Sequence, residues 1–197
     1  VDKPQVFSNL VDLAAAKMGG EALLCSDDFF AEMENLLKEG RGVFVPERYT
    51  ERGKWMDGWE SRRRRTPGHD WCVIKLGVPG RICGFDIDTN HFLGNHAPFA
   101  SIDGCYVEGD LSPEDFRDRV DWDEILAPSA LERGCQNIFV SQKQKRCTHI
   151  RIHIYPDGGV ARLRVYGTTS RRESEAKSID LASVLEPGTE DAQLEAN

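Results

Sequence analysis

The sequence predicts an all-β protein: an antiparallel, jelly-roll-like β-sandwich that follows a short helical N-terminal segment. Apolar and polar residues alternate cleanly over residues 148–155 and again over 161–166, which is the pattern of strands with one buried face. The segments between strands carry short Gly- and Pro-containing turn signals rather than helical crossovers. Turns of this kind favour antiparallel pairing in a sandwich over a parallel sheet.

The first forty residues have a helical or mixed pattern. Apolar residues at helical spacing over 10–14 are ended by Gly19-Gly20. Ser26-Asp27-Asp28 has the composition of a helix N-cap. These signals predict a second helix over 29–38, with its apolar side chains on one side and a stop at Gly40.

The remaining elements are strands, predicted at 71–76, 81–88, 102–107, 137–140, 148–155 and 161–166. Gly77 and Pro79-Gly80 predict a turn that joins the first two strands as a hairpin. Neighbouring antiparallel strands run in opposite directions, so the hairpin's two outer ends fall at one edge of the sheet. We therefore expect the loops at 57–70 and 88–96 to meet there and to form one ligand site.

Composition excludes several classes of protein. The net charge of −8 argues against nucleic acid as the main partner, because phosphate binding needs a basic face. The run Arg62-Arg63-Arg64-Arg65 is a local exception that is typical of a solvated loop. No stretch reaches the roughly 20 apolar residues of a membrane span. The first residues also lack the basic-then-apolar pattern of a signal peptide.

The six cysteines form neither a CxxC pair nor a zinc spacing. Several fall on apolar strand faces, where a free thiol behaves as a small buried hydrophobe. We therefore expect reduced core thiols, with Cys72, Cys83 and Cys105 buried and unpaired.

Three long motifs follow one another along the chain. They are GKWMDGWESRR from Gly53 with GHDW at 68–71, GFDIDTNHFLGNHAP from Gly84, and IYPDGGVARLRVYG from Ile154. In this order they resemble the allantoicase family from about residue 9 to 167, and several long motifs in register make a specific match.

The resemblance implies a two-repeat enzyme that hydrolyses allantoate to ureidoglycolate and urea in purine (ureide) degradation. Each repeat is expected to be a sandwich similar to discoidin and galactose-binding domains. This chain departs from that pattern because it holds one full repeat, at 1–167. Residues 168–197 are expected to be a linker and the truncated start of a second repeat, since Ile179-Asp180-Leu181-Ala182 echoes Val11-Asp12-Leu13-Ala14.

Allantoate carries a carboxylate and two ureido groups on one carbon. An arginine suits the carboxylate, and acidic or Asn side chains suit the ureido groups. A general base or a metal must activate water, and an acid must help urea to leave. Two clusters supply such groups: Asp57, Glu60, Arg62, Arg63, His69 and Asp70, and then Asp86, Asp88, Asn90, His91, Asn95 and His96.

The candidate catalytic residues are Glu60, His91 and Asp88, with His91 or Glu60 as the proton carrier. Arg63 is the expected carboxylate anchor. The full set of expected substrate-binding residues is Asp57, Arg62, Arg63, His69, Asp70, Asn95 and His96. The mixed oxygen and nitrogen ligands of the second cluster would suit a divalent metal ion, but no compact metal motif is present and no metal ligand is assigned. His149 and His153 are expected to be structural or solvent-facing.

Two classes of function compete. The first is an allantoate amidinohydrolase. The second is a non-catalytic, discoidin-like binding module or an inactive family member, because sandwiches host both roles. We expect a small-molecule substrate, no nucleic acid or membrane partner, and a homo-oligomer in the cytoplasm, with the peroxisome as the alternative compartment.

Overall fold

The fold is a two-layer antiparallel β-sandwich whose layers share one long, arched strand. The computed structural model describes residues 5–169. Its strands are β1 (Val11–Asp12), β2 (Glu21–Cys25), β3 (Tyr49–Thr50), β4 (Gly53–Lys54), β5 (Trp59–Glu60), β6 (Asp70–Asp88), β7 (Phe99–Cys105), β8 (Asp123–Ala130), β9 (Gln136–Val140), β10 (Arg146–Tyr155), β11 (Gly159–Val160) and β12 (Arg162–Thr169). Its helices are three 3₁₀ turns, Gln5–Phe7, Ala16–Met18 and Met33–Leu37, and the short α1 (Asp115–Asp118).

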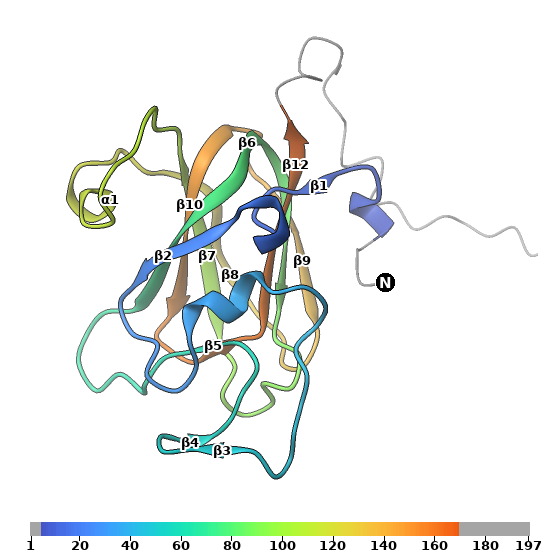
Figure 1. Ribbon diagram of the computed structural model, residues 1–197, viewed down its shortest axis with the longest axis vertical. Helices are drawn as coiled ribbons and strands as arrows, with labels where there is room; N and C mark the ends of the chain where they lie inside the picture. The colour runs from blue at the N-terminus through green and yellow to red at the C-terminus, as the bar shows by residue number, and fades with distance from the viewer. Residues whose placement is uncertain (1–4, 170–197) are drawn as a thin grey trace, which may run out of the picture.

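Strand β6 belongs to both layers. Its first arm, residues 70–77, pairs with β2 and β10, and its second arm, residues 80–88, pairs with β12 and β9. One layer is completed by β7 and β8 beside β10, and the other by β1 beside β12. Figure 1 shows β6 rising along one side of the molecule, arching over its top and descending between β12 and β9. All of these pairs are antiparallel, as the sequence predicts.

The predicted turn at Pro79-Gly80 is wrong, because β6 continues through it. Gly77 and Gly80 lie where other backbones cross the strand. A Cβ at Gly77 would be 2.3 Å from the carbonyl oxygen of Met18, and one at Gly80 would be 2.5 Å from that of Thr168. The ladders of β10 and β12 against β6 both shift register near this bend, and bulges of this kind let a strand curve. The glycines therefore mark an arch rather than a hairpin.

The predicted helix over 29–38 is also wrong, since only Met33–Leu37 is helical, as a 3₁₀ turn. The backbone N–H groups of Phe30 and Ala31 instead donate to the carbonyl oxygen of Glu60, which ties this stretch to β5. Asp27 accepts a hydrogen bond from the Phe29 N–H, as a helix-capping residue would, but no helix begins at this point. Tertiary pairing has overridden a local helical pattern here.

The core lies between the two layers, and a second covered zone lies outside β10. Ile150, Ile152 and Ile154 are fully buried, as predicted. His149 and His153 on the opposite face of β10 are only 5% and 9% exposed. The connection between β7 and β8 covers His149, with the Phe116 ring centroid 4.2 Å from that of His149. The His69 ring lies against His153, with 4.9 Å between ring centroids. These histidines are therefore not solvent-facing.

All six cysteines are unpaired, and Cys72, Cys83 and Cys105 are buried, which confirms the thiol prediction for residues 5–169.

In this part of the chain no helix is long and apolar enough to cross a membrane. The predicted linker and second-repeat start lie, from residue 170 onward, outside the described residues.

Candidate functional site

The two polar loops meet at one end of the sandwich. Strand β10 ends beside Asp70, and β12 begins beside Asp88, so both ends of the arched β6 are at the lower end of the molecule in Figure 1. Asn95 Nδ2 donates a 2.8 Å hydrogen bond to Glu60 Oε1, which joins the second loop to the first. The predicted convergence is therefore present, although an arch across two layers produces it and not a hairpin within one sheet.

A hollow of about 300 Å³ opens at this junction. We call it the Glu60 hollow, and it is lined by Phe44, Lys54, Met56, Glu60, His91, Leu93, Gly94 and Asn95. Burial raises the pKa of the Glu60 carboxyl above its ordinary value, and the hydrogen bond from Asn95 offsets part of the rise. A half-buried acid with a raised pKa beside a histidine is a common feature of sites that transfer protons.

His91 has an unusual backbone conformation at the rim of the Glu60 hollow. Its φ is +67°, in the left-handed region that non-glycine residues rarely occupy. The next residue, Phe92, is fully buried and donates its N–H to the carbonyl oxygen of Thr89, which closes the turn. The exposed His91 ring stacks on Phe44, with 5.6 Å between ring centroids. The turn thus presents the imidazole to the hollow's edge.

Asp88 and Asp57 lie near this end but are held in buried ion pairs. Arg41 donates from Nε and Nη2 to the two Asp88 oxygens at 2.8 and 2.9 Å, and the Asn90 N–H bonds to the same carboxylate. Arg162 Nη2 donates to Asp57 Oδ2 at 2.8 Å, with the two side chains 3% and 7% exposed. Both carboxylates therefore join chain segments, which leaves neither one open in the Glu60 hollow.

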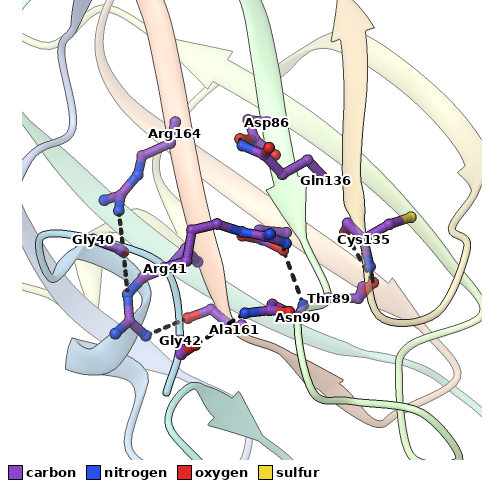
Figure 2. Close-up of polar contacts among 12 residues, drawn as sticks. Gly40, Arg41, Gly42, Asp86, Thr89, Asn90, Cys135, Gln136, Ala161 and Arg164 are labelled. Atoms are coloured by element: carbon purple, nitrogen blue, oxygen red, sulfur yellow. Dashed lines mark hydrogen bonds and ion pairs between the residues drawn. The ribbon is translucent and has the colours of Figure 1, made fainter. Parts of the chain in front are cut away.

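The outer face of the second β6 arm holds another buried acid, Asp86. Figure 2 shows Asp86 beside Gln136, whose Nε2 donates to Asp86 Oδ2, with Arg41 and Arg164 nearby around Gly40. Burial raises the pKa of Asp86 to about 7. Among residues 5–169 no group of three or more His, Cys, Asp or Glu side chains is placed to hold a metal ion. Of the second cluster, Asp88 is held by Arg41, and the buried His96 Nδ1 has no hydrogen-bond partner within the described residues.

A second hollow of about 310 Å³ is lined mainly by residues that follow β5. We call it the arginine hollow, and it is lined by Asp27, Arg62, Arg63, Arg64, Arg65, Thr66 and Asp70. Arg62 pairs with Asp27, and Arg64 pairs with Asp70, each at 2.8 Å. Arg63 and Arg65 are exposed and make no ion pair within the described residues. No residue lines both hollows, so Arg63 is not in the hollow of Glu60 and His91.

His69 takes part in a chain of hydrogen bonds that the sequence did not reveal. Its Nε2 is 2.8 Å from His153 Nδ1, and His153 Nε2 is 2.7 Å from Asp103 Oδ2. Arg151 also donates to Asp103 Oδ2, at 2.8 Å from Nη2. Burial alone would raise the pKa of Asp103, but the hydrogen bonds from His153 and Arg151 outweigh it and hold the pKa below its ordinary value.

Comparison with known proteins fits the geometry and the motifs. The family model described as an allantoicase repeat matches residues 11–170. The chain belongs to the allantoicase family. The protein named "Probable allantoicase 2" of Burkholderia mallei is 44% identical over 185 residues, which cover 92% of this chain and 54% of that protein. The allantoicase of Dictyostelium discoideum is 47% identical over 164 residues, covering 83% and 44%. This chain therefore spans about half the length of the relatives that it matches.

Solved structures agree with the family assignment. The crystal structure of allantoicase from Saccharomyces cerevisiae superposes with a TM-score of 0.69 at 38% identity, covering 81% of this chain and 48% of that one. A carbohydrate-binding module of a Clostridium perfringens glycoside hydrolase has a TM-score of 0.56 at 15% identity. The second likeness establishes only that this allantoicase repeat shares the sandwich fold with such modules.

The structure divides the sequence-predicted residues of this allantoicase repeat into separate groups. Glu60, His91 and Asn95 line one hollow, whereas Arg62, Arg63 and Asp70 line the other. Asp57 and Asp88 are in buried ion pairs, and His69 bonds to His153. Sequence reasoning missed Lys54 and Asp103. Lys54 lies at the end of the short β3–β4 hairpin, inside the first quoted motif, but sequence reasoning assigned it no role. Asp103 lies in the middle of β7, between Ile102 and Gly104, where no polar cluster marks it.

Proposed function

We propose that this allantoicase repeat takes part in the hydrolysis of allantoate to ureidoglycolate and urea, and that the substrate binds in the Glu60 hollow. Family membership supports the choice of substrate. The observation that carries the site is Glu60 itself: a half-buried acid with a raised pKa that contacts Asn95 and shares a hollow with His91. A small polar ligand matches a hollow of about 300 Å³ with this lining.

Each side chain has a distinct task in the proposed reaction. The Lys54 ammonium, held over the Phe44 ring at 4.4 Å, supplies the positive charge for the substrate carboxylate. Asn95 holds Glu60 through one amide hydrogen and offers its carbonyl oxygen to a ureido N–H. Glu60 takes a proton from the attacking water, and His91 gives one to the nitrogen of the departing urea. The C–N bond breaks as the new C–O bond forms, so atoms and charge balance.

Asp57, Asp88 and His96 act in this proposal as supports rather than as reacting groups. The Asp88–Arg41 pair holds the 40–42 segment against the start of the 88–96 loop, and Asn90 Nδ2 bonds to the Gly42 carbonyl oxygen at 2.9 Å. The backbone of His96 pairs with Gly159, next to the β11–β5 ladder that carries Glu60. These contacts hold in place the backbone segments that carry Glu60 and Asn95.

We also propose that the chain works as a homo-oligomer in a reducing compartment, the cytoplasm or the peroxisome. Val43, Phe44, Val45 and Leu93 are exposed large hydrophobic residues, and Phe44 and Leu93 border the Glu60 hollow. Exposed apolar surface of this kind often marks a protein contact. Six free thiols support a reducing compartment, because disulfides form in oxidising ones.

Urea release from allantoate by this chain tests the function. Glu60→Gln keeps the size of the side chain and its bond to Asn95 but removes the proton carrier, so we expect kcat to fall by roughly 10²–10⁴-fold with KM little changed. Glu21→Gln, an exposed change on β2, is the matched control and should leave the rate unaltered.

Two further measurements separate the competing functions. Unchanged activity of Glu60→Gln would contradict the assignment of the site. Allantoate binding by calorimetry without urea release, by this chain and by a protein with a second repeat, would favour the non-catalytic binding module. A chelator added to both assays decides whether a divalent metal contributes.

A further inference from the structure

The hydrogen-bond chain at His69 has a defined direction. A carboxylate only accepts hydrogen bonds, so in the neutral His153 tautomer that donates from Nε2 to Asp103, the Nδ1 atom is an acceptor. Arg151 Nε lies 3.1 Å from His153 Nε2 and 3.2 Å from Asp103 Oδ2, and in this tautomer it donates to Asp103. His69 then donates a hydrogen bond from Nε2 to His153 Nδ1, over 2.8 Å. In that arrangement the remaining ring nitrogen of neutral His69, Nδ1, carries no proton, and it has no hydrogen-bond partner within the described residues. The hydrogen-bond chain therefore runs from Asp103 through His153 to His69, whose Nδ1 atom can then act as a base.

The surroundings hold His69 in one orientation. Its ring lies against the Tyr155 ring at 4.6 Å, and the Tyr155 hydroxyl is fixed by Ser101 at 2.9 Å. Asp103 is in turn clamped by Arg151, whose guanidinium lies over the Trp122 ring. The inner members are largely buried, with the His153 and Asp103 side chains 11% and 15% exposed. Asp103 orients His153, and His153 in turn orients His69, which is similar to the way an acid orients a catalytic histidine in nucleophile–base sites.

His69 stands between residues that line the arginine hollow, although its own side chain does not line it. The next residue, Asp70, lines that hollow and pairs with Arg64. Burial lowers the pKa of His69, and the neighbouring His153 and Arg64 lower it further, with Asp70 opposing and Arg151 adding to the effect. His69 is therefore neutral near neutral pH and able to accept a proton. Arg63 and Arg65 bring unpaired positive charge to the same segment.

We propose that His69 is a second proton acceptor of this chain, oriented by His153 and Asp103, and that it serves a small carboxylate ligand held by Arg63 and Arg65. The ligand must also carry an N–H or O–H group, whose proton passes to His69 Nδ1. His69 can hand its Nε2 proton to His153 Nδ1, and the resulting charge is balanced by Asp103. The proposal rests on the proposed function only for the identity of the ligand, since allantoate and ureidoglycolate both belong to this chemical class.

Histidine-ring NMR of the intact chain tests this directly, because the sequence has only five histidines. Single His→Gln variants assign the ring signals. Allantoate is titrated into the wild-type chain at several pH values, and urea is measured in the same samples. We expect the His69 signals to move on binding and the pKa of His69 to rise, because a carboxylate comes to lie nearby. His149, stacked on the buried Phe116, is the internal control and should not respond.

Variants test the two arginines that would bind the ligand carboxylate and the acid at the far end of the hydrogen-bond chain. The double variant Arg63→Gln, Arg65→Gln should weaken the ligand response of His69 at least about 10-fold, whereas the exposed Arg133→Gln should not. Asp103→Asn should lower the pKa of His69 without weakening the anchor. If the ligand moves His91 and leaves His69 unchanged, it binds in the Glu60 hollow alone, so the inference is wrong and the proposed function stands. If no histidine responds and no urea appears, both are wrong.

Discussion

Replacing Asp57 by Ala distinguishes a structural carboxylate from a substrate ligand. Asp57 and Arg162 form a buried pair at 2.8 Å, and Asp57 also accepts the Val43 N–H at 2.9 Å. Removal of one partner leaves a buried, unpaired guanidinium, which costs about 3–5 kcal/mol. For a domain of this size each kcal/mol lowers Tm by about 2–4 °C, so we expect a loss of roughly 6–20 °C.

The pH dependence of this contribution has a definite sign. Burial alone would raise the pKa of Asp57, but its hydrogen bonds with Arg162 and Val43 outweigh that effect and hold the pKa below its ordinary value. The stabilisation is therefore present above the ordinary carboxyl pKa and is lost as pH falls through the lower folded-state value. Asp57→Ala should consequently lose its disadvantage relative to the wild type in acid.

Urea unfolding followed by circular dichroism measures the effect at neutral and acidic pH. Glu39→Gln is the matched control, since Glu39 pairs with Lys17 on the surface, with side chains 69% and 66% exposed, and should leave the unfolding midpoint almost unchanged. A loss below about 1 kcal/mol for Asp57→Ala, together with abolished allantoate binding, would refute the structural reading and return Asp57 to the ligand site.

Four further predictions follow from single positions. Glu60→Gln should be more stable than the wild type at pH values above the raised folded-state pKa of Glu60, with the difference vanishing below the ordinary glutamate pKa, as chemical unfolding across pH would measure. His91→Gly should keep or raise stability by up to about 1 kcal/mol because glycine accepts the left-handed backbone, while urea release falls; marked unfolding in a thermal melt would contradict this. Gly159→Ala should cost about 1–3 kcal/mol in denaturant titration, because its Cβ would lie 2.1 Å from ring atoms of the buried Phe92; an unchanged midpoint would count against it. Leu93→Glu should reduce the mass seen by analytical ultracentrifugation if the exposed rim forms the homo-oligomer contact, and an unaltered mass would place that contact elsewhere.

The candidate site was predictable in part from local sequence. Glu60, His91 and Asn95 stand in polar, glycine-flanked loops, where function is concentrated, and the structure brings them into one hollow. The division of the predicted residues between two hollows was not predictable, because Glu60 and Arg63 are three residues apart but line different hollows. The burial of Asp57 and Asp88 was also hidden, because their partners Arg162 and Arg41 are distant in sequence.

By itself the sequence predicted the strands at 71–76, 81–88, 148–155 and 161–166 and their apolar faces, because period-two alternation is a property of neighbouring residues. It gave no such signal for β2 and β8. It also determined the family, through motifs written along the chain. Only the tertiary structure decided what Gly77 and Gly80 do, since a glycine signal fits both a turn and an arch. The crossing backbones of Met18 and Thr168 select the arch. The same holds for the His69–His153–Asp103 chain: its members come from β10, β7 and the loop before β6, and only strand pairing sets them within hydrogen-bond distance.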